Sequence, residues 1–263
     1  MGIVNVTPDS FSDGGRLGTV EAAVAHGLRL VEQGADLLDI GGESTRPGAE
    51  PVDAAQEIAR VVPVIEALRA RWAGPISVDT MKPEVARAAV GAGASIWNDV
   101  SALTFDPRSA ETAAALGCGV VLMHMKGEPG TMQAEPRYGD VVAEVTSWLA
   151  ARADAAMAAG VARERIWLDP GLGFGKTAAH NLTLTARLDQ FVALGFPVLY
   201  GASRKRTIQS VDPSAADPTD RLGGSLALAL EAARRGAAVV RVHDVRETVQ
   251  AVALQAAVLG AGS

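Results

Sequence analysis

The sequence predicts an α/β protein that folds as a single (β/α)8 barrel, a TIM barrel, over residues 1–263. The first observation is the length, because 263 residues match the roughly 250 that one such barrel uses. The second is an alternation of short apolar, β-branched runs with amphipathic stretches, which implies parallel strands joined by right-handed crossovers. The third is that eight such runs occur, as a closed barrel requires. An open doubly wound sheet is the alternative.

Each strand of this barrel has a candidate segment. The expected strands are GIVNV at 2–6, DLLDIGG at 36–42, PISVDT at 75–80, ASIWNDV at 94–100, GVVLMHM at 119–125, RIWLDPG at 165–171, PVLYGAS at 197–203 and AVVRVHD at 238–244. Amphipathic stretches such as TVEAAVAHGLRLVEQGA, AAQEIARVVPVIEALRARW and VVAEVTSWLAARADAAMAAG lie between them and predict the outer helices. No linker or low-complexity run interrupts the alternation, which indicates one domain.

Composition limits the environment and the partners of the protein. The net charge of −6 argues against a general nucleic-acid or anionic-membrane surface. Cys118 is the only cysteine, which excludes an intrachain disulfide and a cysteine-based zinc site and fits a reducing compartment. No apolar run approaches the ~18 residues of a membrane span, and no signal-like segment precedes the first strand. We therefore expect a cytoplasmic protein that binds small molecules.

The segment PGLGFGKT at 170–177 raises the question of a nucleotide-binding loop, in which backbone N–H groups surround phosphate oxygens. Gly175, Lys176 and Thr177 match the last three positions of that motif. Pro170 occupies the first position, however, and has no N–H to donate. The segment alone therefore favours another role, and the rest of the chain must decide which.

Polar and glycine residues gather where the predicted strands end. They are Asn5, Asp39, Gly41, Asp79, Asn98, Asp99, His124, Asp169, Ser203, Arg241 and His243. The carboxyl ends of all strands in a barrel meet on one face, and catalytic residues come from several of them. The opposite strand ends show no comparable cluster. This asymmetry favours an enzyme over a binding module or a structural protein.

Asp79, Asn98 and Asp169 place two carboxylates and an amide at three strand ends. Each of them alone is better explained as part of a polar network that closes the barrel. Together they suit a flat, nitrogen-rich heterocycle, because a carboxylate pairs with adjacent N–H groups much as it pairs with guanidinium. Residue types alone do not distinguish such a ring from a sugar or an amide.

Cationic residues form a complementary set near the same strand ends. Arg46 follows the second strand, Lys205 the seventh, and Arg241 with His243 the eighth. Barrels often hold phosphate in the loops after strands seven and eight. The run SRKR at 203–206 also fits a solvated basic turn, and Arg241 an ion pair across the barrel mouth. Several cations on one face favour an anionic, phosphate-bearing substrate.

The histidines receive structural interpretations. His124 lies between Met123 and Met125, so strand alternation points the methionines to one face and the histidine to the other. If Met123 faces the barrel interior, it forms an apolar wall for a bound ring. His26 and His180 are expected at the surface. No spacing of histidine and acidic residues resembles a transition-metal site, and no nucleophile elbow occurs.

The strand-end segments together resemble the dihydropteroate synthase family, pterin-binding barrel enzymes of the folate pathway. The matching segments follow in order along the chain: MGIVNVTPDSFSDGG (1–15), DIGGESTRPGA (39–49), SVDT (77–80), NDV (98–100), LMHM (122–125), DPGLGFGK (169–176), GASRK (201–205) and RVHDV (241–245). The resemblance assigns PGLGFGKT to the loop after the sixth strand. Methyltransferases that pass a methyl group from methyltetrahydrofolate to corrinoid proteins share the pterin-binding acids, but they do not need SRK or the diphosphate-binding cations. A non-enzymatic pterin-binding barrel is a third alternative.

The resemblance implies a transferase that condenses 6-hydroxymethyl-7,8-dihydropterin diphosphate with p-aminobenzoate, releases diphosphate with the help of Mg²⁺, and is a target of sulfonamides. It implies that the pterin is held by Asp79, Asn98, Asp169 and Lys205, in a slot lined by Met123, Phe174 and Gly201, with Arg241 stacked on the ring. The diphosphate would be held by Thr45, Arg46, Arg241 and His243, and Asn5 would help to position Mg²⁺. Family members commonly form homodimers through their barrel helices, so a homodimer is expected.

The resemblance also implies that p-aminobenzoate binds in a pocket formed with Pro47, Phe174 and Ser203. The segments TPDSFSDGG at 7–15 and GGESTRPG at 41–48 are expected to close over both substrates. Asp13, near the end of the first of these segments, is our candidate to stabilise the pterin cation or to orient the attacking amine. Closure would exclude water, which otherwise captures the cation.

Overall fold

The computed structural model describes residues 1–6, 15–44, 51–127, 132 and 136–261. Within these ranges, eight short strands carry the predicted barrel. Their bounds are β1 Gly2–Asn5, β2 Leu38–Gly41, β3 Ile76–Asp79, β4 Ile96–Asp99, β5 Gly119–Met123, β6 Ile166–Asp169, β7 Leu199–Tyr200 and β8 Val239–Val240. Strands β1 to β6 pair in parallel in chain order, and β7 pairs in parallel with β8. All eight predicted strand segments are confirmed.

Backbone hydrogen bonds close the strands into a ring at two seams. At the first seam, Val242 N donates to Met1 O at 2.9 Å and Ile3 N donates to Val242 O at 3.1 Å, which joins the end of β8 to β1. At the second, Leu168 N donates to Pro197 O at 2.9 Å, which joins β6 to the chain entering β7. The ring of parallel strands confirms the closed barrel over the open sheet.

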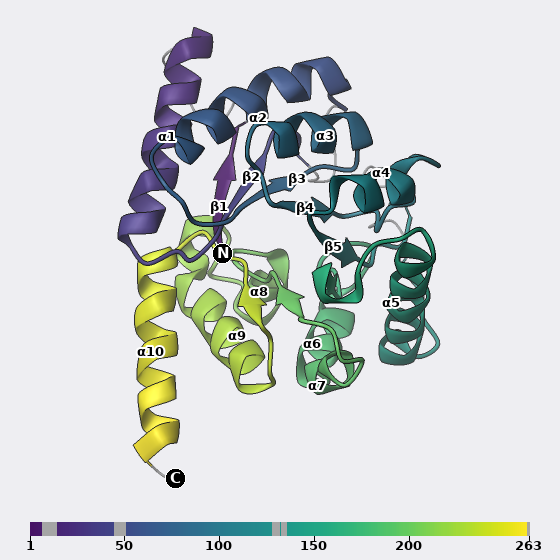
Figure 1. Cartoon of the computed structure of the whole chain (residues 1–263). Coiled ribbons are helices and arrows are strands. Elements are labelled where there is room, and N and C mark those ends of the chain that lie inside the picture. Colours follow the sequence, from purple (N-terminus) through teal and green to yellow (C-terminus); the bar gives the residue numbers. More distant parts are fainter. Residues whose placement is uncertain (7–14, 45–50, 128–131, 133–135, 262–263) are drawn as a thin grey trace.

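Helices follow every strand and surround the ring (Figure 1). They are α1 Gly15–Glu32, α2 Ala54–Arg69, α3 Pro83–Gly91, α4 Ser109–Leu116, α5 Val141–Ala158, α6 Ala178–Ala186, α7 Leu188–Val192, α8 Arg206–Val211, α9 Leu222–Arg234 and α10 Val245–Ala261, with short 3₁₀ turns η2 Arg163–Arg165 and η3 Pro218–Arg221. Side-chain caps fix where several begin: Asp53 accepts from Gln56 N before α2, and Asp140 accepts from Val142 N before α5. No helix in the described ranges has the length and apolar character needed to cross a membrane.

Strand alternation separates the interior of the barrel from its outer core. The interior holds a small apolar cluster of Met1, Leu37, Ile96, Val121 and Leu199, against which Trp167 and Val239 pack. Residues of the opposite parity, such as Leu38, Val78 and Trp97, belong to the larger core with the helices. Positions two residues beyond the interior cluster point inward as well. They are Ile3, Asp39, Asn98, Met123, Asp169, Gly201 and Arg241. The apolar cluster is therefore the floor of the barrel, and polar residues lie above it.

The surface placement predicted for His26 and His180 is only partly correct, because both are half-buried. The Nε2 atom of His26 lies 3.3 Å from Ile3 O, so this ring fills space between α1 and β1. Burial lowers the pKa of His26, and the carbonyl opposes that effect. His180 takes part in a capping box with Thr177 at the start of α6. Both histidines therefore have structural roles.

Two adjacent glycines at the start of α9 provide a test of the packing. A Cβ on Gly224 would overlap Cγ2 of the buried Ile208, whereas a Cβ on Gly223 would meet nothing within 4 Å. We expect Gly224→Ala to lower the free energy of unfolding by about 1–3 kcal/mol through overpacking. Gly223→Ala should be neutral or raise it by up to about 1 kcal/mol through helix propensity. Urea unfolding of both variants checks this, and equal stabilities would contradict the packing of α8 on α9.

Candidate active site

The polar strand ends meet at the carboxyl-end face of the barrel, as predicted. Asp79 ends β3, Asn98 lies near the end of β4, and Asp169 ends β6. Asn98 and Asp169 expose only 4% and 7% of their surface, and Asp79 is half-buried. Two carboxylates and an amide thus share one largely dehydrated volume above the apolar floor.

Arg241 connects β8 to two strands across this volume. Its Nε donates to Asp39 Oδ2 at 2.6 Å, and its Nη2 donates to Asp79 Oδ2 at 2.8 Å. Asp39, on β2, is fully buried and also accepts from Asn98 Nδ2 at 3.3 Å. The positive charge of Arg241 therefore offsets the negative charges of two carboxylates. Of its side-chain surface, 21% remains exposed.

Burial leaves the carboxylates of this site poorly solvated. It raises the pKa of Asp79 to about 7, against the attraction of Arg241. It also raises the pKa of Asp169, against the attraction of Lys205. Because hydrogen bonds to a carboxylate favour its charged form, a ligand with N–H donors stabilises both groups. The arrangement therefore suits a ligand that presents N–H groups.

Lys205 lies between the carboxylates and the loop that follows β6. Its Nζ donates to Leu172 O at 2.5 Å and lies 4.9 Å from the centre of the Phe174 ring. Burial lowers the pKa of Lys205 to about 8, and Asp169 opposes this shift. Asp169 itself accepts from Gly171 N at 2.7 Å. The ammonium thus lies next to an aromatic face, in a cation–π arrangement.

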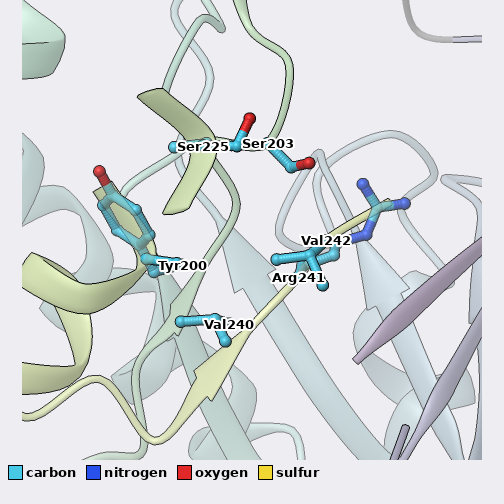
Figure 2. A pocket seen from close by; sticks show the side chains of 8 residues that line it. Tyr200, Ser203, Ser225, Val240, Arg241 and Val242 are labelled. Carbon is cyan, nitrogen blue, oxygen red and sulfur yellow. The ribbon is translucent and has the colours of Figure 1, made fainter. Parts of the chain in front are cut away.

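The backbone after β7 turns sharply so that alternate side chains reach the site. Arg204 has a φ of 59°, and its side chain turns outward to Asp244, with Nε 3.0 Å from Oδ2. Ser203 and Lys205, on either side of it, face inward. The Ser203 hydroxyl lies 3.0 Å from His243 Nδ1. Figure 2 shows the Ser203 hydroxyl and the Arg241 guanidinium on the same side of β7 and β8, with the Tyr200 ring on the other.

Glycines leave open space beside these groups. A Cβ on Gly41 would lie 3.8 Å from Asn5 Oδ1 and 3.9 Å from Asp79 Oδ2, so both oxygens border the same gap. A Cβ on Gly201 would lie 3.8 Å from Cβ of Arg241, which leaves the stem of that side chain uncovered. Both positions provide room where the prediction places substrate.

Met123 faces the barrel interior, because it lies two residues after Val121 of the apolar floor on the same strand. Of the two orientations considered from the sequence, this is the one that makes Met123 an apolar wall for a bound ring.

Two of the predicted strand-end residues, His124 and Asp99, point away from the barrel interior, so their placement at the site is wrong. His124 points away from the interior and packs against Trp148 of α5, with ring centres 4.9 Å apart. Asp99 accepts from Ser101 N at 2.7 Å and Leu103 N at 2.8 Å, which shapes its own loop.

Four of the predicted site residues lie outside the described residues: Asp13, Thr45, Arg46 and Pro47. Three other residues belong to the site or its support without having been given a role in it from the sequence. Asp39 is one of the predicted strand-end residues, and it has the interior parity of Asn98 and Asp169, so strand alternation could have assigned it to the site. Asp244 and Lys176 act through contacts between loops, for which the sequence carries no periodic signal.

Comparison with known proteins shows the family of the chain. The chain matches the family described as pterin binding enzyme over residues 1–243. It is 48% identical over 261 residues to the dihydropteroate synthase of Escherichia coli (strain K12), covering 99% of this chain and 92% of that protein. The Xanthomonas albilineans dihydropteroate synthase solved with 4-aminobenzoic acid is 56% identical, with a TM-score of 0.93 over 98% of this chain and 92% of that one. The same synthase in complex with 7,8-dihydropteroate is 53% identical, with a TM-score of 0.90 and the same coverage.

The barrel fold and the family match thus define a pterin-binding enzyme. More narrowly, the chain belongs to the dihydropteroate synthase family. It is accordingly a transferase that forms 7,8-dihydropteroate from 6-hydroxymethyl-7,8-dihydropterin diphosphate and p-aminobenzoate, with release of diphosphate.

The buried pair of Asp39 and Arg241 should contribute to stability as well as to the site. We expect Asp39→Asn to lower the free energy of unfolding by about 1–3 kcal/mol, because Arg241 loses a charged hydrogen-bond partner and keeps only Asp79. Asp53→Asn is the control, since asparagine replaces aspartate well at an exposed N-cap. Urea unfolding at neutral pH compares the two. A loss for Asp39→Asn no larger than that of the control would show that the pair is dispensable.

Proposed function

We propose that the enzyme binds its two substrates side by side at the strand ends and that the described residues divide the work as follows. Asp79, Asn98 and Asp169 hold the pterin, and Lys205 lies over it. The observation that carries this assignment is the convergence of these groups on one largely buried volume above the apolar floor, where burial raises the pKa of both carboxylates, so that added N–H donors from a pterin would stabilise their charged forms.

The pterin slot has walls as well as donors and acceptors. Met123 rises from the apolar floor on β5, and the Phe174 ring lies next to the Lys205 ammonium. Gly201 leaves one side of the slot open along the Arg241 stem. A flat ring held by Asp79 and Asp169 at its edge would therefore stack beside the Arg241 guanidinium.

The diphosphate of the first substrate is held by cationic and hydrogen-bonding side chains on the neighbouring side. Arg241 and His243 follow β8, the usual position for a phosphate group in a barrel, and Thr45 with Arg46 completes the set. Asn5 Oδ1 borders the gap beside Gly41, and an amide oxygen is a suitable Mg²⁺ donor. Bound Mg²⁺ would supply charge neutralisation on the departing diphosphate.

Departure of diphosphate breaks the C–O bond of the substrate and leaves a dihydropterin CH₂ cation. Asp79 and Asp169 stabilise this cation by their charge, and Asp13 stabilises it or orients the amine. The nitrogen of p-aminobenzoate then forms the C–N bond and releases a proton. Phe174, Ser203 and Pro47 shape the pocket from which it attacks, and the Lys205 stem separates the two substrates.

The protein functions as a cytoplasmic homodimer in this proposal. Its support is a row of exposed apolar side chains on α10, where Leu254 and Val258 each expose 65% of their surface and Leu259 exposes 59%. Leu230 of α9 lies beside them and widens the apolar face. Burying such a face against a second copy would remove it from water. Light scattering in solution would show twice the mass of one chain.

The test of this function is release of diphosphate in the presence of both substrates. The proposal expects release that requires p-aminobenzoate, is blocked by a sulfonamide and is lost when Mg²⁺ is chelated. A matched reaction with methyltetrahydrofolate and a corrinoid acceptor should show no methyl transfer. Diphosphate release that is absent, or that is independent of p-aminobenzoate, would contradict the proposal.

Lys205 and its neighbour provide a matched pair of variants. We expect Lys205→Ala to lower kcat/KM at least 100-fold with little change in melting temperature, because its ammonium lies in the site. Arg206 is exposed at the start of α8, and Arg206→Ala should be nearly neutral, as most surface substitutions stay within about 0.5 kcal/mol. Steady-state kinetics and thermal unfolding of both variants check this. If both variants lower kcat/KM equally and only slightly, the run SRKR is a solvated basic turn with no role in the reaction.

The pH profile of the reaction should report the ammonium of Lys205. Burial lowers its pKa in the free protein to about 8, and only the protonated form carries the positive charge that strengthens its hydrogen bonds. We therefore expect kcat/KM, which reports groups of the free enzyme, to fall as pH rises through about 8. Lys205→Arg keeps its charge in this range and should lack that decline. The same decline in Lys205→Arg would assign it to another group.

A further inference from the structure

We propose that Lys176 is a positioning residue, whose buried ammonium holds the loop 170–177 in the shape that places Lys205 and Phe174 at the site. Lys176 touches neither substrate in this proposal and acts through the loop. The inference rests on the proposed function in one respect, namely that Lys205 takes part in the reaction.

The Lys176 ammonium lies inside the loop rather than at the surface. Only 3% of the residue is exposed, and its Nζ contacts four acceptors. These are Gly171 O at 2.9 Å, Phe174 O at 3.0 Å, His124 O at 3.1 Å and His124 Nδ1 at 2.9 Å. No carboxylate of the described residues forms an ion pair with it. Burial lowers the pKa of Lys176 to about 7, and the charge of Asp169 opposes this shift. The amino group is therefore surrounded by acceptors of the loop and of His124.

These contacts also define the state of His124. A ring nitrogen that faces an ammonium must be the acceptor, so His124 is neutral with its proton on Nε2. Burial and the charge of Lys176 lower the pKa of His124 to about 3, which agrees with that geometry. The histidine at the end of β5 and the loop after β6 are thus joined through a single ammonium.

The loop can wrap around the ammonium because of its glycines. Gly171 has a φ of 66°, and a Cβ there would overlap His124 O. Gly175 has a φ of 63°, and a Cβ there would overlap Lys126 O. The Tyr138 hydroxyl secures the outer side of the loop by donating to Gly175 O at 2.8 Å. The pattern G-L-G-F-G-K thus builds a cradle for its own lysine.

The same loop carries the contacts that place the reactive groups. Leu172 O accepts from Lys205 Nζ, and the Phe174 ring lies 4.9 Å from that ammonium. Gly171 N donates to Asp169 Oδ1 at 2.7 Å. Without Lys176, the carbonyls of Gly171, Phe174 and His124 would converge with no donor between them. The loop would then relax, and the partners of Lys205 and Asp169 would move.

A double-mutant cycle separates positioning from a purely structural role. Residues that act together show non-additive effects, whereas independent residues show effects that multiply. We expect Lys176→Met to lower kcat/KM at least tenfold in the wild-type background and by a clearly smaller factor in the Lys205→Ala background, where only the shifts of Phe174 and Asp169 remain. Calorimetric affinity for 7,8-dihydropteroate in the same four proteins should show the same coupling without requiring turnover. Lys126→Met is the control, because Lys126 lies beside the loop but is exposed, and its effect should stay below twofold.

The outcomes distinguish the two proposals. If Lys205→Ala is impaired and the Lys176→Met loss is equal in both backgrounds, only the positioning role is overturned. If Lys205→Ala is fully active, the roles of both lysines are overturned. Should Lys176→Met fail to fold, Tyr138→Phe removes the outer support of the loop. It is expected to lower kcat/KM two- to fivefold in the wild-type background alone, and an equal loss in both backgrounds would overturn the positioning role.

Discussion

The guanidinium of Arg241, bonded to Asp39 and Asp79, is the interaction on which the rest of the structure depends. It links the end of β8 to β2 and β3 across the barrel. The pairing of β7 with β8 extends over only two residues each, so backbone bonds alone hold this part of the ring weakly. The Arg241 side chain therefore holds the end of β8 to β2 and β3, and it also places a positive charge at the carboxyl-end face of the barrel.

The charge balance of this site prepares it for its substrates. Asp39, Asp79 and Asp169 face Arg241 and Lys205, and burial raises the pKa of Asp79 and Asp169 while it lowers that of Lys205. Burial thus disfavours the charged forms of Asp79, Asp169 and Lys205. In the proposed function, a pterin provides N–H donors for the carboxylates, and a diphosphate provides an anion for the cations. Substrate binding would then give these buried charged groups the hydrogen bonds and ion pairs that water does not supply, from side chains that are already oriented.

Much of this could be predicted from the sequence, because two periodic signals carry it. Eight apolar runs predicted the strands, and the two-residue alternation explains why Asn98 and Met123 face inward while Asp99 and His124 face outward. The remainder depends on contacts between loops. The cradle of Lys176 requires the path of the chain from Gly171 to Gly175, and the outward turn of Arg204 requires Asp244 and the left-handed backbone. No local pattern encodes such pairs, since their partners lie on different strands or loops.

The central claim is that the substrates are recognised by the buried acids at the strand ends. A crystal structure of the protein with 7,8-dihydropteroate tests it most directly. The account predicts pterin nitrogens within hydrogen-bond distance of Asp79 and Asp169, with the Lys205 ammonium near the bond between the pterin and p-aminobenzoate parts. A pterin bound elsewhere, or at the strand ends with neither carboxylate in contact, would contradict it.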